Sequence, residues 1–156
     1  MSRKLGYVQA FNEAVRQEMA ANENVFCAGE DIGAFGGVFQ SYAGLQAEFG
    51  ERRVVDTPIS EQAIIGLGVG AAATGLRPIV DIMFMDFICV AFDQIVNQIA
   101  KFRYMFGGQC ACPVVIRMTT GGGRNAGAQH SQTFYPIFTS FPGLIALATV
   151  VSFVFF

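Results

Sequence analysis

The feature that most constrains the fold is an alternation of short apolar runs with longer segments of helical periodicity. Strands are expected at residues 25–28, 53–55, 78–84, 113–118 and 144–151. Helices are expected at residues 7–21, 41–49, 61–75 and 86–106. Strands that alternate with helices pair in parallel, and the helices then cover both faces of the sheet. The sequence therefore predicts an α/β fold, a doubly wound and mostly parallel sheet flanked by helices, in a single domain over residues 1–156.

The unusual polar residues fall in the loops that follow these strands. The loops span residues 29–37, 56–61, 84–87 and 119–130. In open α/β sheets, ligands bind beyond the carboxyl ends of the strands, where such loops meet. The clustering therefore predicts one functional site at this edge of the sheet.

Glu61 is the strongest candidate in these loops. It follows an apolar strand and opens a helix of small residues that carries no other charge before Arg77. A partly buried carboxylate is costly unless it has a partner or a function. We therefore expect Glu61 to transfer a proton in catalysis. The alternative is an ordinary first-turn residue that the helix dipole favours.

Phe87 and His130 are the other candidates at the loop ends. His130 is the single histidine of the chain, and it follows a glycine-rich loop. A core role for Phe87 and a structural role for His130 are the alternatives. Asp86 is interpreted as a helix cap, and Glu30 and its neighbour Asp31 as residues that either shape a turn or join the site.

These residues stand in a set of motifs that resembles one enzyme family. The motifs are Thr57-Pro58-Ile59-Ser60-Glu61, Asp86-Phe87 and Gln129-His130-Ser131-Gln132, with residues 29–31 and 104–108 beside them. Together they resemble the pyrimidine-binding domain in the beta subunit of thiamine-diphosphate-dependent 2-oxo acid dehydrogenases (the E1 component), within the transketolase-like superfamily. Residues 86–87 and 101–108 look most like the acetoin dehydrogenase branch. The likeness runs from about Lys4 to Leu144.

The resemblance implies roles for individual residues. Glu61 matches the carboxyl group that hydrogen-bonds N1′ of the cofactor's aminopyrimidine, and Phe87 matches the ring that stacks on it. Ile59, in the same motif as Glu61, is assigned to the cofactor-binding set, and His130 matches the histidine beside the substrate. The implied activity is that of an oxidoreductase acting on a 2-oxo acid or on acetoin.

The resemblance also implies that a partner completes the site. The chain lacks the Gly-Asp-Gly…Asn segment that holds Mg²⁺ and the diphosphate in this superfamily. In the heterotetrameric enzymes that segment belongs to an alpha subunit, so no metal site is expected here. Alone, the chain is expected to be inactive, and one alternative is that it binds no cofactor by itself. The alternative function is a catalytically silent domain that binds itself or a partner.

The last residues depart from the family. The likeness stops near Leu144, and the apolar ending over residues 145–156 looks like a truncation. Residues 131–156 carry no charge, but Pro136 and Pro142 interrupt them. A membrane-spanning helix needs about 20 predominantly apolar residues, so a buried or edge strand is favoured over an anchor. An uncovered apolar strand invites self-association, which makes a homodimer the alternative to pairing with an alpha subunit.

Composition narrows the class of partner and compartment. The net charge is −2 and no basic run occurs, so nucleic acid is not expected as a partner. The amino terminus is polar and lacks a secretory segment, and the four cysteines are interpreted as reduced thiols, so a cytoplasmic protein is expected.

Cys110 and Cys112 have no second cysteine or histidine pair nearby, which favours plain thiols over a metal site. Residues 66–71 resemble a dinucleotide fingerprint, but they lie inside a helix, where glycines favour close packing.

Overall fold

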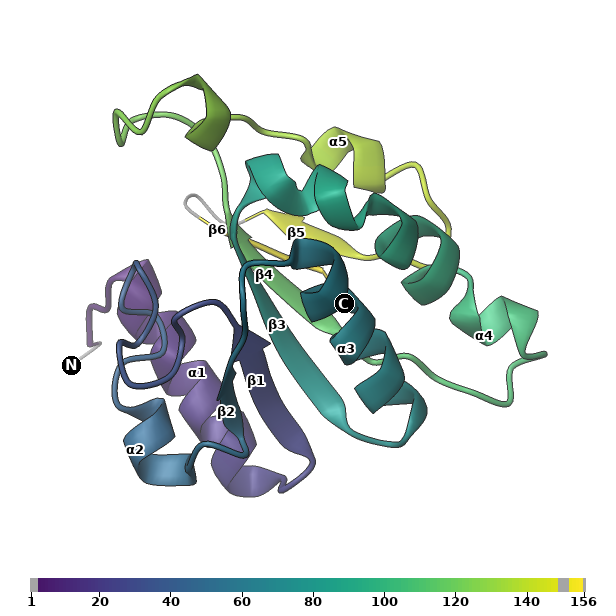
Figure 1. Ribbon diagram of the computed structural model, residues 1–156, viewed down its shortest axis with the longest axis horizontal. Helices are drawn as coiled ribbons and strands as arrows, with labels where there is room; N and C mark the ends of the chain where they lie inside the picture. The colour runs from purple at the N-terminus through teal and green to yellow at the C-terminus, as the bar shows by residue number, and fades with distance from the viewer. Residues whose placement is uncertain (1–2, 149–151, 156) are drawn as a thin grey trace.

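The computed structural model describes residues 3–148 and 152–155, which form a six-stranded sheet covered by helices. The strand order is β2-β1-β3-β4-β6-β5 (Figure 1). The strands are β1 Val25–Gly29, β2 Val54–Asp56, β3 Arg77–Phe84, β4 Val115–Thr119, β5 Ala146–Ala148 and β6 Ser152–Phe155. The first four strands pair in parallel, whereas β6 is antiparallel to both β4 and β5. The predicted α/β fold with a mostly parallel sheet is confirmed.

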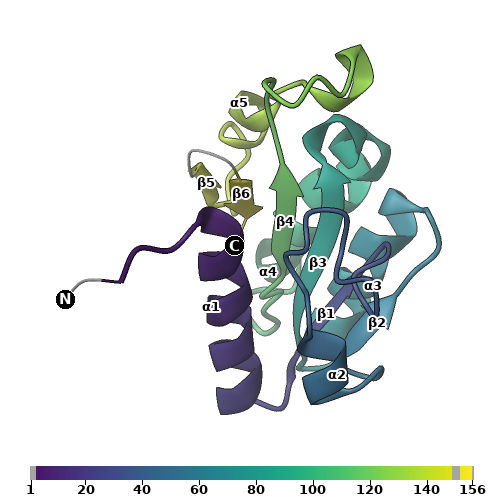
Figure 2. The ribbon, with the colours of Figure 1, turned by 90° about the vertical axis from the view of Figure 1, so that its left-hand side faces the viewer.

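Helices lie on both faces of this sheet. The α-helices are α1 Tyr7–Ala21, α2 Leu45–Phe49, α3 Glu61–Ala73, α4 Phe102–Met105 and α5 Tyr135–Phe138. Two 3₁₀ segments, η1 Met85–Ala91 and η3 Ala128–His130, and one π segment, η2 Gln94–Ile99, complete the helical structure of the described residues. Figure 2 shows α1 on one face of the sheet and α3 on the other, as a doubly wound fold requires.

Alternate residues of the strands feed two separate cores. On β1, Val25 and Cys27 join the core beneath α1, whereas Phe26 and Ala28 join the core beneath α3. All five residues of β1 are buried. A strand that is covered on both faces reads as a continuous apolar run, because neither face meets water. This burial explains why the strands were visible in the sequence as short runs without alternation.

The segment after β3 differs from the uninterrupted helix predicted over residues 86–106. It winds as 3₁₀ over η1, as π over η2 and as α over α4. The predicted apolar side is nevertheless largely kept, since Ile88, Ile95, Ile99 and Phe102 are all buried. Hydrophobic periodicity specifies which side faces the core, but it does not specify the local winding, and 3₁₀ and π turns occur inside longer helical runs.

The carboxyl-terminal segment lies at the edge of the sheet. A strand was predicted over residues 144–151; its described part contains β5, and residues 149–151 lie outside the described residues. β5 is the outermost strand beside β6, in agreement with the predicted buried or edge strand. Within the described residues, no helix is both long and apolar enough to cross a membrane.

Candidate active site

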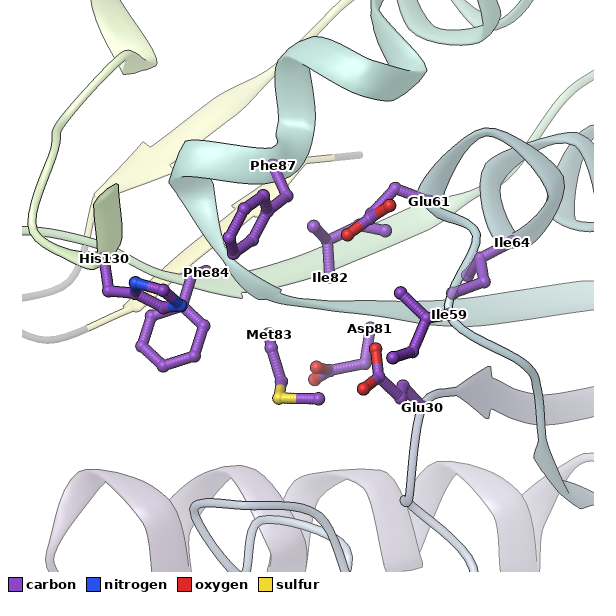
Figure 3. A pocket seen from close by; sticks show the side chains of 10 residues that line it. All are labelled: Glu30, Ile59, Glu61, Ile64, Asp81, Ile82, Met83, Phe84, Phe87 and His130. Carbon is purple, nitrogen blue, oxygen red and sulfur yellow. The ribbon is translucent and has the colours of Figure 1, made fainter. Parts of the chain in front are cut away.

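A pocket of about 240 Å³ lies where the carboxyl ends of β1 and β3 meet the start of α3 (Figure 3). It is lined by Glu30, Ile59, Glu61, Ile64, Asp81, Ile82, Met83, Phe84, Phe87 and His130. Each of the four loops predicted to converge contributes at least one of these residues. The three candidates for catalysis and stacking, Glu61, Phe87 and His130, are therefore brought to one cavity.

Glu61 is the first residue of α3 and is half-buried at the pocket. Ser60 precedes the helix but makes no side-chain capping hydrogen bond. Glu61 is the acidic residue of the first turn. A negative charge at this position is favoured by the helix dipole. In Figure 3 the Glu61 carboxylate points into the space that the ring of Phe87 also faces.

Aromatic rings form the opposite side of the pocket. The imidazole of His130 lies edge-on to Phe84, with ring centroids 4.7 Å apart, and edge-on to Phe87 at 5.2 Å. Phe84 and Phe87 themselves contact at 6.4 Å. Edge-to-face packing is a preferred arrangement of aromatic rings. It fixes the imidazole beside Phe87, while Figure 3 shows Phe87 between His130 and Glu61 in this view.

Ile59 lies at the mouth of the same pocket. Ile59 is 75% exposed, whereas Ile64 and Ile82 in the same lining are buried. An exposed branched side chain at the rim of an apolar pocket can contact a bound molecule or a covering partner. This geometry is compatible with the predicted place of Ile59 among the cofactor-binding residues.

Three carboxyl groups give the pocket a negative character. Glu30, at the end of β1, joins Glu61 and Asp81 in the lining. Partial burial, and then the charges of Asp31, Glu61 and Asp81, raise the pKa of Glu30 above its ordinary value. Of the two interpretations of Glu30 left open by the sequence, the structure thus favours membership of the site. Asp31, with φ of 55°, occupies the left-handed region of a turn.

Asp81 is a pocket residue that the sequence reasoning missed. It lies in β3 opposite Arg117 of β4, and both residues are only 3% exposed. Arg117 Nη1 donates to Asp81 Oδ2 at 3.0 Å, and the Tyr42 hydroxyl donates to the same oxygen at 2.9 Å. Charged residues are rarely buried unless paired, so a lone Asp within an apolar strand was the signal available in the sequence.

Contacts within this buried network raise the pKa values of Arg117 and Tyr42. Burial lowers the pKa of Arg117, but the charge and hydrogen bond of Asp81 outweigh that effect and leave it raised. Burial and the charge of Asp81 raise the pKa of Tyr42 well above its usual value. The guanidinium therefore stays charged and the phenol stays neutral, and the pair holds Asp81 in place under the pocket.

The interpretation of Asp86 as a helix cap is wrong. No side chain caps η1; instead, Asp86 Oδ1 accepts hydrogen bonds from the backbone nitrogen of Gln132 at 3.1 Å and from its Nε2 at 2.9 Å. Sequence alone did not reveal this contact, because the two residues lie 46 positions apart. Asp86 thus joins the segment that carries Phe87 to the loop that carries His130.

The other glycine-rich segments behave as packing and loop elements. Gly66, Gly68 and Gly70 all lie inside α3, as expected of helix-packing glycines rather than of a dinucleotide-binding turn. A Cβ on Gly68 would lie 3.2 Å from Val80, whereas Gly66 and Gly70 face open space. The loop before His130 places the Arg124 guanidinium 4.9 Å from the ring centroid of Phe39.

Comparison with known proteins agrees with this arrangement. Residues 3–152 match the family described as transketolase, pyrimidine binding domain. The chain is 51% identical, over 92% of its length, to the acetoin:2,6-dichlorophenolindophenol oxidoreductase subunit beta of Cupriavidus necator, and 49% identical, over 92%, to its namesake in Bacillus subtilis. It is 48% identical, over 87%, to the pyruvate dehydrogenase E1 component subunit beta of Rhizobium meliloti. The matches cover 45%, 46% and 30% of these relatives, so the chain spans less than half of their length.

Proposed function

The chain belongs to the transketolase pyrimidine-binding domain family, and from that premise we propose that it forms the pyrimidine-binding half of a thiamine-diphosphate site. The proposed enzyme is an E1-type dehydrogenase that acts on acetoin or a 2-oxo acid. The observation that carries the proposal is that Glu61, Phe87 and His130 line a single pocket.

The lining of the pocket is compatible with an aminopyrimidine ring. A flat heteroaromatic ring needs an apolar face for stacking and a hydrogen-bonding group at its edge. Phe87 and Ile82 supply apolar surface, and Glu61 supplies a carboxyl group directed into the same space. The volume of about 240 Å³ is below the roughly 300–1,000 Å³ of pockets for drug-sized ligands. The pocket therefore suits one ring of a larger cofactor, with the remainder held elsewhere.

Glu61 is proposed to hold a proton at a ring nitrogen of the aminopyrimidine. Half-buried at the start of α3, its carboxyl group lines the pocket, where it can donate or accept a hydrogen bond. Such positioned acid–base groups contribute typically about 10²–10⁴-fold to rate. Thiamine diphosphate, when bound, supplies a nucleophilic carbon and an electron sink for cleavage next to a carbonyl.

His130 is proposed to orient the substrate and to donate a hydrogen bond to its carbonyl oxygen. Its imidazole is held by Phe84 and Phe87 in edge-on contacts and is half-buried at the pocket. A donor that is fixed before the reaction stabilises developing negative charge without reorganisation. Removal of one such donor costs about 2.7–4 kcal/mol in other enzymes.

An alpha subunit is proposed to complete the site with Mg²⁺ and the diphosphate-binding residues. Relatives with 51% and 48% identity are named as beta subunits, of an acetoin oxidoreductase and of pyruvate dehydrogenase E1. Within the described residues, no group of three or more His, Cys, Asp and Glu side chains could hold a metal ion. The exposed side chain of Ile59 at the pocket mouth is surface that such a partner would cover.

Reconstitution with an alpha subunit of this enzyme class tests the proposal. The mixture is given thiamine diphosphate, Mg²⁺ and 2,6-dichlorophenolindophenol, with acetoin, pyruvate or 2-oxoisovalerate as substrate. Dye reduction is expected with at least one substrate, and Glu61→Gln is expected to slow it by about 100-fold or more, whereas the exposed Glu23→Gln serves as the matched control. An assembled complex that binds the cofactor but turns over none of the substrates would contradict the proposal.

A further inference from the structure

Gln132 is the point where three segments around the pocket meet. Its backbone nitrogen and Nε2 donate to Asp86 Oδ1 at 3.1 and 2.9 Å. Its carbonyl oxygen accepts hydrogen bonds from the backbone nitrogen of Gly121 at 3.2 Å and from Thr120 Oγ1 at 3.1 Å. Gln132 therefore joins both ends of the glycine-rich loop to the start of η1 through hydrogen bonds.

The hydrogen bonds between Asp86 and Gln132 join the two segments whose rings, Phe87 and His130, are in contact. Asp86 immediately precedes Phe87, and Gln132 follows His130 by two residues. The same two segments meet again where the backbone nitrogen of Phe134 donates to Met85 Sδ at 3.0 Å. We propose that Asp86 is a positioning residue: through Gln132 it sets the imidazole of His130 against the ring of Phe87. Its catalytic consequence rests on the proposed function.

Besides these hydrogen bonds, the loop is held by ring contacts of His130 and Arg124 and by the hydrogen bond from Thr120 Oγ1 to Thr133 Oγ1 at 3.0 Å. Gly121, Gly123 and Gly127 adopt positive φ angles of 82°, 92° and 82°, as does Asn125 at 55°. Glycine allows many backbone conformations, so the loop sequence by itself does not define a shape. The position of His130 therefore depends on side-chain contacts at the base of the loop, and Asp86 makes two of them.

The chemistry of the Asp86 carboxylate agrees with a positioning role. A single ionised oxygen accepts both hydrogen bonds, and charge-assisted hydrogen bonds are roughly twice as strong as neutral ones. The second oxygen, Oδ2, is buried and accepts no hydrogen bond from the described residues. A buried acceptor without a partner is unfavourable for stability. Stability alone therefore does not explain a carboxylate at this position, whereas the precision of the contact with Gln132 does.

Nuclear magnetic resonance on the chain itself tests this positioning without any need for activity. His130 is the single histidine, so no other imidazole signal overlaps with its own. The wild type should show a nuclear Overhauser cross-peak between His130 and Phe87, whose ring centroids lie 5.2 Å apart. Asp86→Ala should lose this cross-peak, and Asp86→Asn, which keeps an acceptor oxygen, should retain part of it.

Asp93→Ala is the matched control, because Asp93 also accepts a side-chain amide, that of Asn97, but away from the pocket. It should leave the cross-peak unchanged. If Asp86→Ala does not fold, the exposed Gln132→Ala removes one of the two hydrogen bonds and should still weaken the signal. An undiminished cross-peak in the folded Asp86 or Gln132 variants, or an equal loss in Asp93→Ala, would overturn the proposal.

Kinetics of the reconstituted complex give the second readout. A displacement of about 1 Å at a reacting group can cost about 100-fold in rate, so Asp86→Ala should lower kcat about 10- to 100-fold with a smaller change in KM. Asp86→Asn should recover part of the loss. A wild-type complex without turnover would refute the proposed function alone, since the cross-peak still decides whether Asp86 positions His130. Wild-type kcat in Asp86→Ala would overturn the positioning role.

Discussion

Replacement of Arg117 by methionine should destabilise the chain far more than loss of any surface ion pair. Both partners of the Arg117–Asp81 pair are 3% exposed, and the guanidinium also donates to Ser41 Oγ at 2.9 Å. Removal of one member of a buried pair costs about 3–5 kcal/mol, because the other charge remains buried without compensation. The total stability of a domain is only about 5–15 kcal/mol.

Urea unfolding followed by far-ultraviolet circular dichroism measures this loss. For a slope of about 2 kcal/mol per molar, the Arg117→Met midpoint should fall by about 1.5–2.5 M. Arg16→Met is the matched control, since Arg16 pairs with Glu48 at the surface, where ion pairs contribute about 0–1 kcal/mol. The double variant Asp81→Asn with Arg117→Met should recover much of the loss, because Asn still accepts the hydrogen bond from the Tyr42 hydroxyl and leaves no buried charge. A midpoint for Arg117→Met within the range of Arg16→Met would refute the reasoning.

Three further predictions concern helix packing, pH and thiol reactivity. Gly70→Ala, whose Cβ would meet open space in α3, should raise the free energy of unfolding by about 0.5–1 kcal/mol. Gly68→Ala should raise it by less, because its Cβ would lie 3.2 Å from Val80. Equal increases for the two variants would contradict the packing described. The pKa of Glu30 in the folded chain is raised above the ordinary value of 4.5, so the folded state binds more protons than the unfolded state near that pKa. The free energy of unfolding therefore falls as the pH rises through the folded-state pKa. Glu30→Gln should therefore raise the urea midpoint at pH 7 but not at pH 3.5, and a gain at both would contradict it. Ellman's reagent at pH 8 should label the exposed Cys89 first and Cys27 last, since burial raises the pKa of Cys27 to about 12, and rapid labelling of Cys27 in the folded chain would refute its burial.

The parts of the fold that follow from local chemistry were predictable from the sequence. The fully buried β1 and the helix opened by Glu61 were visible as an apolar run and a small-residue periodicity. The convergence of the four loops followed from the rule that the carboxyl ends of parallel strands share one edge. The sequence alone therefore groups Glu61, Phe87 and His130 at one edge of the sheet.

The parts that depend on contacts distant in sequence were not predictable. Arg117 lies 36 positions from Asp81, and Gln132 lies 46 positions from Asp86, so neither pairing leaves a periodic signal. The antiparallel placement of β6 beside β4 likewise depends on tertiary pairing. The change of winding after β3 escaped prediction for another reason: the apolar side of the segment is the same whether it is α-helical or not.

We propose that the proton held by Glu61 at the aminopyrimidine speeds removal of the C2 proton from the bound cofactor. This proposal is tested most directly by the rate of hydrogen–deuterium exchange at C2 of thiamine diphosphate in the reconstituted complex, measured by proton magnetic resonance after acid quench. Glu61→Gln should slow this exchange by about 100-fold or more, in line with the 10²–10⁴-fold typical of a positioned acid–base group, while Glu23→Gln exchanges at the wild-type rate. An exchange rate in the cofactor-loaded Glu61→Gln complex equal to that of the wild type would contradict the account.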